Sequence, residues 1–118
     1  MHVVPYVDAP PYDAPGHLGM AMRRLQGREA GPSNSVWIGV SRVEPGGGTT
    51  LSASDVEKFY VCLQGEVVMT ARDANQENST VMRPLDSCRI APHEARQITN
   101  RSTSEALLLL VMPQPLSR

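Results

Sequence analysis

The feature that most constrains the fold is a succession of short β-favouring runs, separated by turn residues, from residue 35 onward. Valine, isoleucine, threonine and aromatic residues fill these runs, while glycine, proline, asparagine and aspartate separate them. No stretch repeats its apolar residues with the 3.6-residue period of an amphipathic helix. We therefore predict an all-β chain that forms a sandwich or a barrel. The predicted strands cover residues 36–43, 49–52, 58–63, 66–72, 79–83, 87–90, 95–99 and 106–112.

Residues 1–35 differ from the rest of the chain, because they hold five of the ten prolines and four of the nine glycines. Proline and glycine at this density oppose regular structure. We predict an extended arm, residues 1–35, with one short strand at residues 20–25, followed by a barrel over residues 36–118. Apolar arm residues such as Val3 and Val4 need cover, so the arm is expected to pack on the barrel or on a partner subunit.

Length and charge exclude several classes of protein. A chain of 118 residues with 41% hydrophobic and 19% charged residues is typical of one globular domain. Its longest apolar run, residues 106–112, is far shorter than the ~20 residues of a membrane span. No signal-peptide pattern is present, so we expect a cytoplasmic protein without a membrane partner. The net charge of −1 and the lack of a basic stripe argue against a nucleic-acid partner.

Two segments carry turn and strand residues in a characteristic order. The first, residues 45–66, begins with Pro-Gly-Gly-Gly and ends with Gly-Glu after a predicted strand. The second, residues 85–100, contains Asp86, a Pro-His bend and Asn100. Together they resemble the two motifs of the cupin superfamily over about residues 36–113. The resemblance implies a double-stranded β-helix, the cupin jelly-roll barrel, and a homodimer.

The resemblance also implies that this chain replaces the metal ligands of the family. Two histidines and a glutamate of the first motif, with a histidine of the second, hold a divalent metal in cupins. The matching positions here are Ser52, Ser54, Lys58 and Arg96. An ammonium or a guanidinium has no free lone pair for a cation, so we expect no metal and no other cofactor. A relocated metal site is an open alternative, with three candidate ligands: Glu57, His93 and Glu94.

Strand alternation predicts which of these residues face inward. Lys58, the single lysine beside ten arginines, shares a face with Tyr60 because successive side chains of a strand point to opposite faces. The predicted interior mouth of the barrel contains Ser52, Ser54, Lys58, Tyr60 and Arg96. Two cations buried there would each cost several kcal/mol without an anionic partner.

The functional hypothesis is that this partner is a small organic anion, a carboxylate or a carbonyl compound. An arginine binds carboxylate through two parallel hydrogen bonds, and a lysine adds a point charge. Burial beside Arg96 should lower the pKa of Lys58, which then suits a general base or a Schiff base. This predicts metal-independent isomerase or lyase chemistry. The catalytic candidates are Lys58, Tyr60 and Glu57, and the ligand-binding candidates are Arg96, Ser52, Ser54, His93 and Trp37.

Other readings stay open at this point. Internal ion pairs of Lys58 with Glu57 or Asp55, and of Arg96 with Glu94, would make the barrel a degenerate cupin with a structural role. The same pocket could also serve a non-catalytic sensor, or a relocated metal could support oxygenase or isomerase chemistry.

Three further features have simple structural interpretations. Trp37 is either a filler of the core or dimer seam, or part of the ligand pocket. His17 is either an exposed turn residue or a lid over the mouth. Residues 45–48 are predicted to form a hairpin turn, since no helix and no Lys-Ser/Thr pair follows them to make a phosphate loop.

Overall fold

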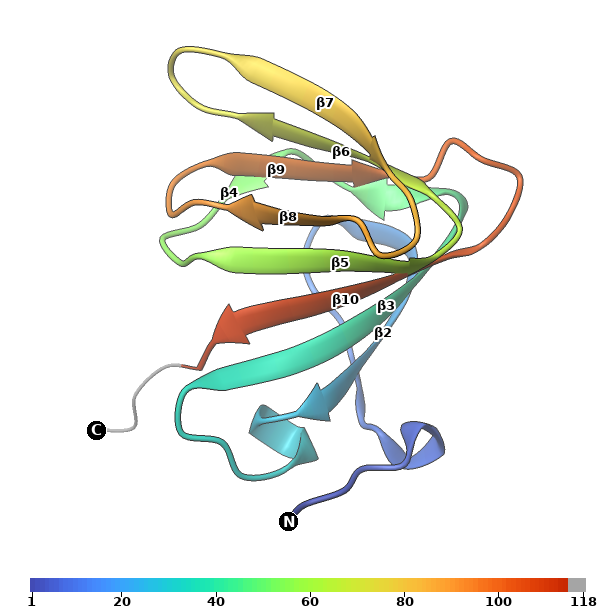
Figure 1. Cartoon of the computed structure of the whole chain (residues 1–118), viewed down its shortest axis with the longest axis vertical. Helices are drawn as coiled ribbons and strands as arrows, with labels where there is room; N and C mark the ends of the chain where they lie inside the picture. The colour runs from blue at the N-terminus through green and yellow to red at the C-terminus, as the bar shows by residue number, and fades with distance from the viewer. Residues whose placement is uncertain (115–118) are drawn as a thin grey trace.

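A computed structural model describes residues 1–114, and their strands curl into a nearly closed barrel (Figure 1). The strands are joined in the order β7-β6-β9-β3-β10-β5-β8, while β2 pairs with β1 and β3, and β4 pairs with β9. The prediction of an all-β fold is therefore confirmed. The elements are η1 (Tyr6–Asp8), β1 (Pro11–Tyr12), β2 (His17–Gln26), η2 (Arg28–Ala30), β3 (Val36–Thr49), β4 (Ser52–Ala53), β5 (Lys58–Gln64), β6 (Val67–Arg72), β7 (Glu77–Met82), β8 (Ser87–Ile90), β9 (Ala95–Thr99) and β10 (Ala106–Pro113).

The largest difference from the predicted strands is the length of β3. Its first half pairs with β2 and β10, and its end pairs with β9 through Gly48 and Thr99. Residues 45–48 lie inside this strand, so the predicted hairpin turn is wrong: the chain passes a corner of the barrel there without reversing. Gly48 makes the corner possible, because a Cβ at this position would lie 2.0 Å from the carbonyl oxygen of Ile98.

The arm packs on the barrel of its own chain. β2 pairs with β3 over most of its length, and β1 pairs with β2. Nη1 of Arg23 donates hydrogen bonds to the carbonyl oxygens of Tyr6, Val7 and Ala9 at 3.2–3.3 Å, which holds the first turn of the chain. The last four residues of the predicted barrel range, 115–118, lie outside the described residues.

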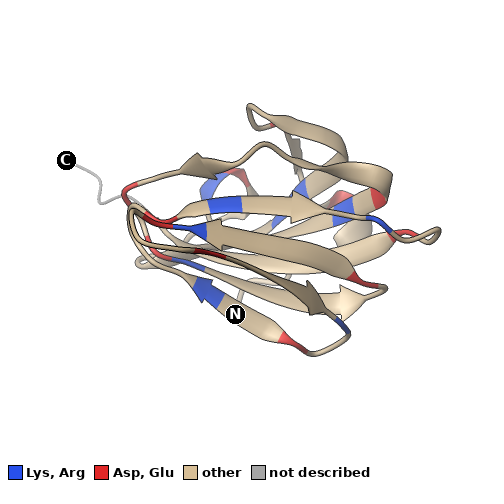
Figure 2. Cartoon of the chain, turned by 90° about the horizontal axis from the view of Figure 1, so that it is seen from above, with Lys and Arg blue, Asp and Glu red and all other residues tan. Residues whose placement is uncertain are grey.

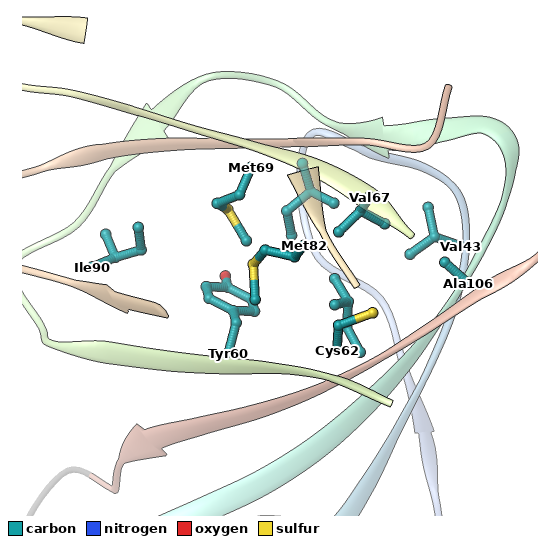
Figure 3. Packing of buried hydrophobic residues seen from close by; sticks show 10 residues of the cluster. Val43, Tyr60, Cys62, Val67, Met69, Met82, Ile90 and Ala106 are labelled. Atoms are coloured by element: carbon teal, nitrogen blue, oxygen red, sulfur yellow. The ribbon is translucent and has the colours of Figure 1, made fainter. Parts of the chain in front are cut away.

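The apolar core is densest at one end of the barrel and reaches along it to Ile90 (Figure 3). Val43, Cys62, Val67 and Ala106 gather at that end, and Tyr60 lies farther along β5 beside Met82. Successive inward side chains of β5 thus change from polar to apolar. The core residues are Val43, Tyr60, Cys62, Val67, Met69, Met82, Ile90, Ile98, Ala106 and Leu108.

Charged residues are distributed without a separated stripe of one sign. Lys and Arg (blue) alternate with Asp and Glu (red) along the strands and turns in Figure 2. The ion pairs of residues 1–114 include Arg42 with Glu105, and Arg89 with Glu57, both on the outer surface. Within the same residues, no helix has the length and apolar character that a transmembrane span requires.

Candidate functional site

A cavity of about 270 Å³ lies between the arm and the polar end of the barrel. We call it the cationic cavity, because Lys58, Arg96 and Arg24 all line it. The barrel contributes Trp37, Ser54, Lys58, Tyr60, Arg96, Leu110 and Met112, and the arm contributes Tyr12, Asp13, Ala14, Pro15, His17 and Arg24.

Lys58 and Arg96 bring positive charge to the inner wall. Lys58 begins β5 and is 6% exposed, while Arg96 lies on β9 and is 5% exposed. Neither side chain takes part in the ion pairs of residues 1–114. The internal ion pairs considered from the sequence are therefore not formed, since Glu57 binds Arg89 and a carboxylate oxygen of Glu94 accepts the backbone N–H of Ala91.

A neutral hydroxyl, rather than a carboxylate, holds Arg96 in place. Oγ1 of Thr49 accepts a hydrogen bond from Nη1 of Arg96 at 2.8 Å and another from the backbone N–H of Ile98 at 3.0 Å. This bond orients the guanidinium and leaves its charge uncompensated. Its Nε–H is buried and has no hydrogen-bond partner among residues 1–114.

An aromatic wall closes another side of the cavity. Tyr12 and Trp37 meet edge to face, with ring centroids 5.7 Å apart. The guanidinium of Arg24 lies 3.8 Å from the Tyr12 ring centroid and 4.5 Å from that of Trp37. Nη1 of Arg24 also donates to both carboxylate oxygens of Glu29, at 2.8 and 2.9 Å, so its charge is compensated.

Burial and neighbouring charge shift the pKa values of the cavity residues. Burial, followed by the charge of Arg96, lowers the pKa of Lys58. Burial raises the pKa of Tyr60, and the nearby Arg96 opposes this shift in part. Burial likewise raises the pKa of Tyr12 to about 12, against the charge of Arg24. Both phenols therefore stay protonated at neutral pH and are able to donate hydrogen bonds.

His17 lies over the cavity as part of the arm. A ring nitrogen, Nδ1, is 2.9 Å from the carbonyl oxygen of Pro15, which fixes the orientation of the imidazole. Partial burial, and then the charges of Arg96 and Lys58, lower the pKa of His17. The structure thus favours the lid position over the exposed turn, and the imidazole is neutral at neutral pH.

Three of the residues predicted for the site lie outside the cavity. Ser52 is exposed because β4 is a two-residue edge strand that pairs with β9 alone. Glu57 precedes β5, does not line the cavity and binds Arg89. His93 is exposed in the turn between β8 and β9, at a φ of 70°, where its backbone N–H donates to the carbonyl of Ser54. The position of Ser52 corrects the predicted interior mouth, and those of Glu57 and His93 remove two predicted site residues from the cavity.

Three aromatic or charged side chains of the cavity were not predicted from the sequence. Tyr12, Asp13 and Arg24 belong to the arm, and no local motif marks them. Asp13 is the only carboxylate among the described residues that line the cavity. Only the tertiary placement of the arm across the barrel brings them to Lys58 and Arg96.

The side chains of the cavity do not fit a divalent metal. Lys58 and Arg96 carry positive charge and offer no lone pair, and Asp13 is a single carboxylate. Among residues 1–114, no three His, Cys, Asp or Glu side chains gather in a way that could hold a metal ion. We therefore derive no chemical step through a metal.

Several solved structures share the architecture of this chain. The polyketide cyclase RemF from Streptomyces resistomycificus superposes with a TM-score of 0.80 and 19% identity, over 96% of this chain and 79% of that one. An RmlC-like cupin from Shewanella frigidimarina superposes with a TM-score of 0.76 and 14% identity, over 98% of this chain and 92% of that one. A predicted oxalate decarboxylase from Thermotoga maritima superposes with a TM-score of 0.75 and 18% identity, over 96% of this chain and 99% of that one. The predicted cupin jelly roll is thus confirmed, and the chain has the fold of a small single-domain cupin.

A curated relative places the chain more narrowly. β-D-Galactosidase Rv1717 from Mycobacterium tuberculosis is 41% identical over 109 residues, which cover 92% of this chain and 90% of the relative. The chain belongs to the same family as this mycobacterial protein. No family model matches the chain.

Proposed function

We propose that the chain is a metal-independent glycosidase that hydrolyses β-D-galactosides in the cationic cavity. The observation that carries this proposal is the 41% identity to a protein named as a β-D-galactosidase, over nearly the whole of both chains. The cavity supports it, because an aromatic wall beside convergent polar groups suits the apolar face and the hydroxyls of a sugar ring.

Hydrolysis of a glycoside requires one group that gives a proton to the leaving oxygen and another that takes a proton from water. We assign the first role to Lys58, since its lowered pKa makes its ammonium a stronger acid than that of an exposed lysine. The second role falls to Asp13, the only carboxylate that lines the cavity within residues 1–114. His17, neutral at neutral pH, is a second group that could accept this proton.

The proposed step balances without a cofactor. Water attacks the anomeric carbon while the bond from that carbon to the leaving oxygen breaks. The leaving oxygen takes the proton of the Lys58 ammonium, and Asp13 takes a proton from the attacking water. Tyr60, protonated at neutral pH, donates a hydrogen bond to a sugar oxygen in the bound substrate.

The experiment that tests the proposal is release of nitrophenol from nitrophenyl β-D-galactoside by metal-free protein, with the α-anomer as the stereochemical control. Asp13→Asn should lower the turnover by about a hundredfold or more. Asp55→Asn removes an exposed carboxylate outside the cavity and should leave turnover unchanged. Absence of β-galactoside hydrolysis in the wild-type protein, or full activity of Asp13→Asn, contradicts the proposal.

A second candidate function is isomerase or lyase chemistry on a small organic anion, with Lys58 as the base and Arg96 as the anion-binding group. The uncompensated charges of these two buried side chains favour it. Borohydride trapping of carbonyl compounds on Lys58 would support this candidate, while galactoside hydrolysis without any adduct would favour the first.

Two expectations from the sequence continue as proposals. We propose that the protein acts in the cytoplasm, where Cys62 and Cys88, both free in the structure, would stay reduced. We also propose a homodimer that covers the exposed apolar residues Phe59 and Leu63 of β5. Phe59→Glu should then lower the mass measured by sedimentation from that of a dimer to that of a monomer.

A further inference from the structure

The buried polar atoms without partners are concentrated in the cationic cavity. Within residues 1–114 these atoms are Nε of Arg24, Nε1 of Trp37, Oγ of Ser54 and Nε of Arg96, and all four residues line the cavity. Buried polar groups are normally hydrogen-bonded, so such a concentration indicates that a bound molecule supplies the partners. Three of the four atoms are N–H groups, and that molecule must therefore offer acceptors.

Charge narrows the chemistry of these acceptors. Arg24 is compensated by Glu29, whereas Lys58 and Arg96 have no carboxylate partner among residues 1–114. Asp13, the one carboxylate at the cavity, is exposed and forms no ion pair within the same residues. A neutral sugar would satisfy hydrogen bonds but would leave two buried cations uncompensated, at a cost that an oxyanion removes.

We propose that the substrate is an acidic galactoside, whose sugar carries a carboxylate or a phosphate ester held by the guanidinium of Arg96, while the Lys58 ammonium stays beside the leaving oxygen. This inference rests on the proposed function and specifies its substrate class. The hydrogen bond that Nη1 of Arg96 donates to Thr49 leaves Nε–H free, so the guanidinium is oriented before the oxyanion arrives. The aromatic wall of Tyr12 and Trp37 then contacts the sugar ring.

The test is calorimetric titration of the full-length protein with three probes: D-galactose, D-galacturonate and D-galactose 6-phosphate. At least one of the acidic sugars should bind about 30-fold or more tightly than galactose. The two acidic probes distinguish a carboxylate from a phosphate. Equal or tighter binding of galactose, or no binding by any of the three probes, would overturn the inference.

Variants link the preference to Arg96. Arg96→Met should reduce the preference for the acidic sugar by about 30-fold or more, whereas Arg101→Met, at an exposed arginine outside the cavity, should retain it. If Arg96→Met fails to fold, Arg96→Lys keeps the charge and loses the planar fork, and a partial loss of the preference is expected. A full preference in a folded Arg96→Met protein, or in Arg96→Lys, would overturn the inference.

Hydrolysis of nitrophenyl β-D-galactoside and of the corresponding nitrophenyl galactosiduronate separates this inference from the proposed function. If both compounds are hydrolysed without preference, the glycosidase proposal is supported and the acidic substrate is contradicted. If galacturonate binds tightly and neither compound is hydrolysed, the glycosidase proposal is contradicted and the oxyanion site is supported.

Discussion

The two ends of the barrel interior are built by the same strands and differ in polarity. Along β5 the inward side chains change from Lys58 through Tyr60 to Cys62, and along β9 they change from Arg96 to Ile98. The alternation of side chains is the same at both ends, so the backbone does not distinguish them. The apolar end contributes hydrophobic stabilisation, whereas the cavity end keeps two buried cations that have no carboxylate partner among the described residues.

The largest expected effect on stability belongs to the apolar end. Leu108 is 1% exposed, and Leu108→Ala should lower the free energy of unfolding by about 2–5 kcal/mol, because it leaves a cavity in the core. Leu109→Ala, at the half-buried neighbour that points outward, should cost clearly less. Urea unfolding of both variants measures the difference. Equal losses would contradict the packing of β10 described above.

Thr49 contacts residues of both ends, because its hydroxyl accepts hydrogen bonds from Arg96 and from the backbone N–H of Ile98. Its replacement should have the next largest effect on the free energy of unfolding. Thr49→Val removes the acceptor of both Arg96 and the Ile98 N–H and should lower the free energy of unfolding by about 1–3 kcal/mol. It should also weaken binding of acidic sugars, since Arg96 loses its orientation. Thr50→Val, at the exposed neighbour, is the matched control for urea unfolding and calorimetry. A stable Thr49→Val protein with unchanged sugar affinity would show that this hydroxyl does not position Arg96.

At the cavity end, removal of a buried charge should not lower the free energy of unfolding, in contrast to the substitutions above. Lys58→Met removes a buried ammonium without a carboxylate partner in the described residues, so the free energy of unfolding should hold or rise by about 1 kcal/mol. Galactoside turnover should be lost in the same protein. If urea unfolding shows that the free energy of unfolding falls by several kcal/mol, Lys58 forms an internal ion pair and has a structural role.

The smallest effect is the dependence of that gain on pH. The folded pKa of Lys58 is lowered from 10.5, so between the folded and unfolded pKa values the unfolded chain holds the additional proton. Within this window the wild-type stability contributed by Lys58 rises with pH. The advantage of Lys58→Met should therefore be greatest at neutral pH and should vanish toward pH 10.5, as urea unfolding at several pH values can measure. An advantage that grows with pH would reverse the sign of the shift.

Period-two alternation predicted the barrel wall of the site better than its outer parts. Lys58, Tyr60 and Arg96 lie on regular strands, where spacing alone decides which side chains share a face. The same rule failed for Ser52, because β4 ends at Ala53 and the alternation does not continue to Ser54. The hairpin predicted at residues 45–48 was wrong because glycine has two uses that the sequence does not distinguish. It forms turns, and it also permits close approach of two backbones, as at Gly48.

The contribution of the arm to the cavity could not be predicted from local sequence patterns. Tyr12, Asp13 and Arg24 reach the cavity through long-range pairing of β1, β2 and β3, which no local pattern of the arm encodes. His17 was foreseen as a lid only as an alternative to an exposed turn. The roles of all these residues in catalysis and binding stay predictions that the experiments above address.

The chain contains a single tryptophan, and Trp37 lies in the wall of the cationic cavity between Tyr12 and Arg24. Its intrinsic fluorescence therefore originates entirely at the site, with no background from other indoles. A molecule that enters the cavity changes the polarity around that indole and displaces solvent from it. The protein thus carries its own optical reporter of occupancy, which permits unlabelled compounds to be screened before any substrate is known.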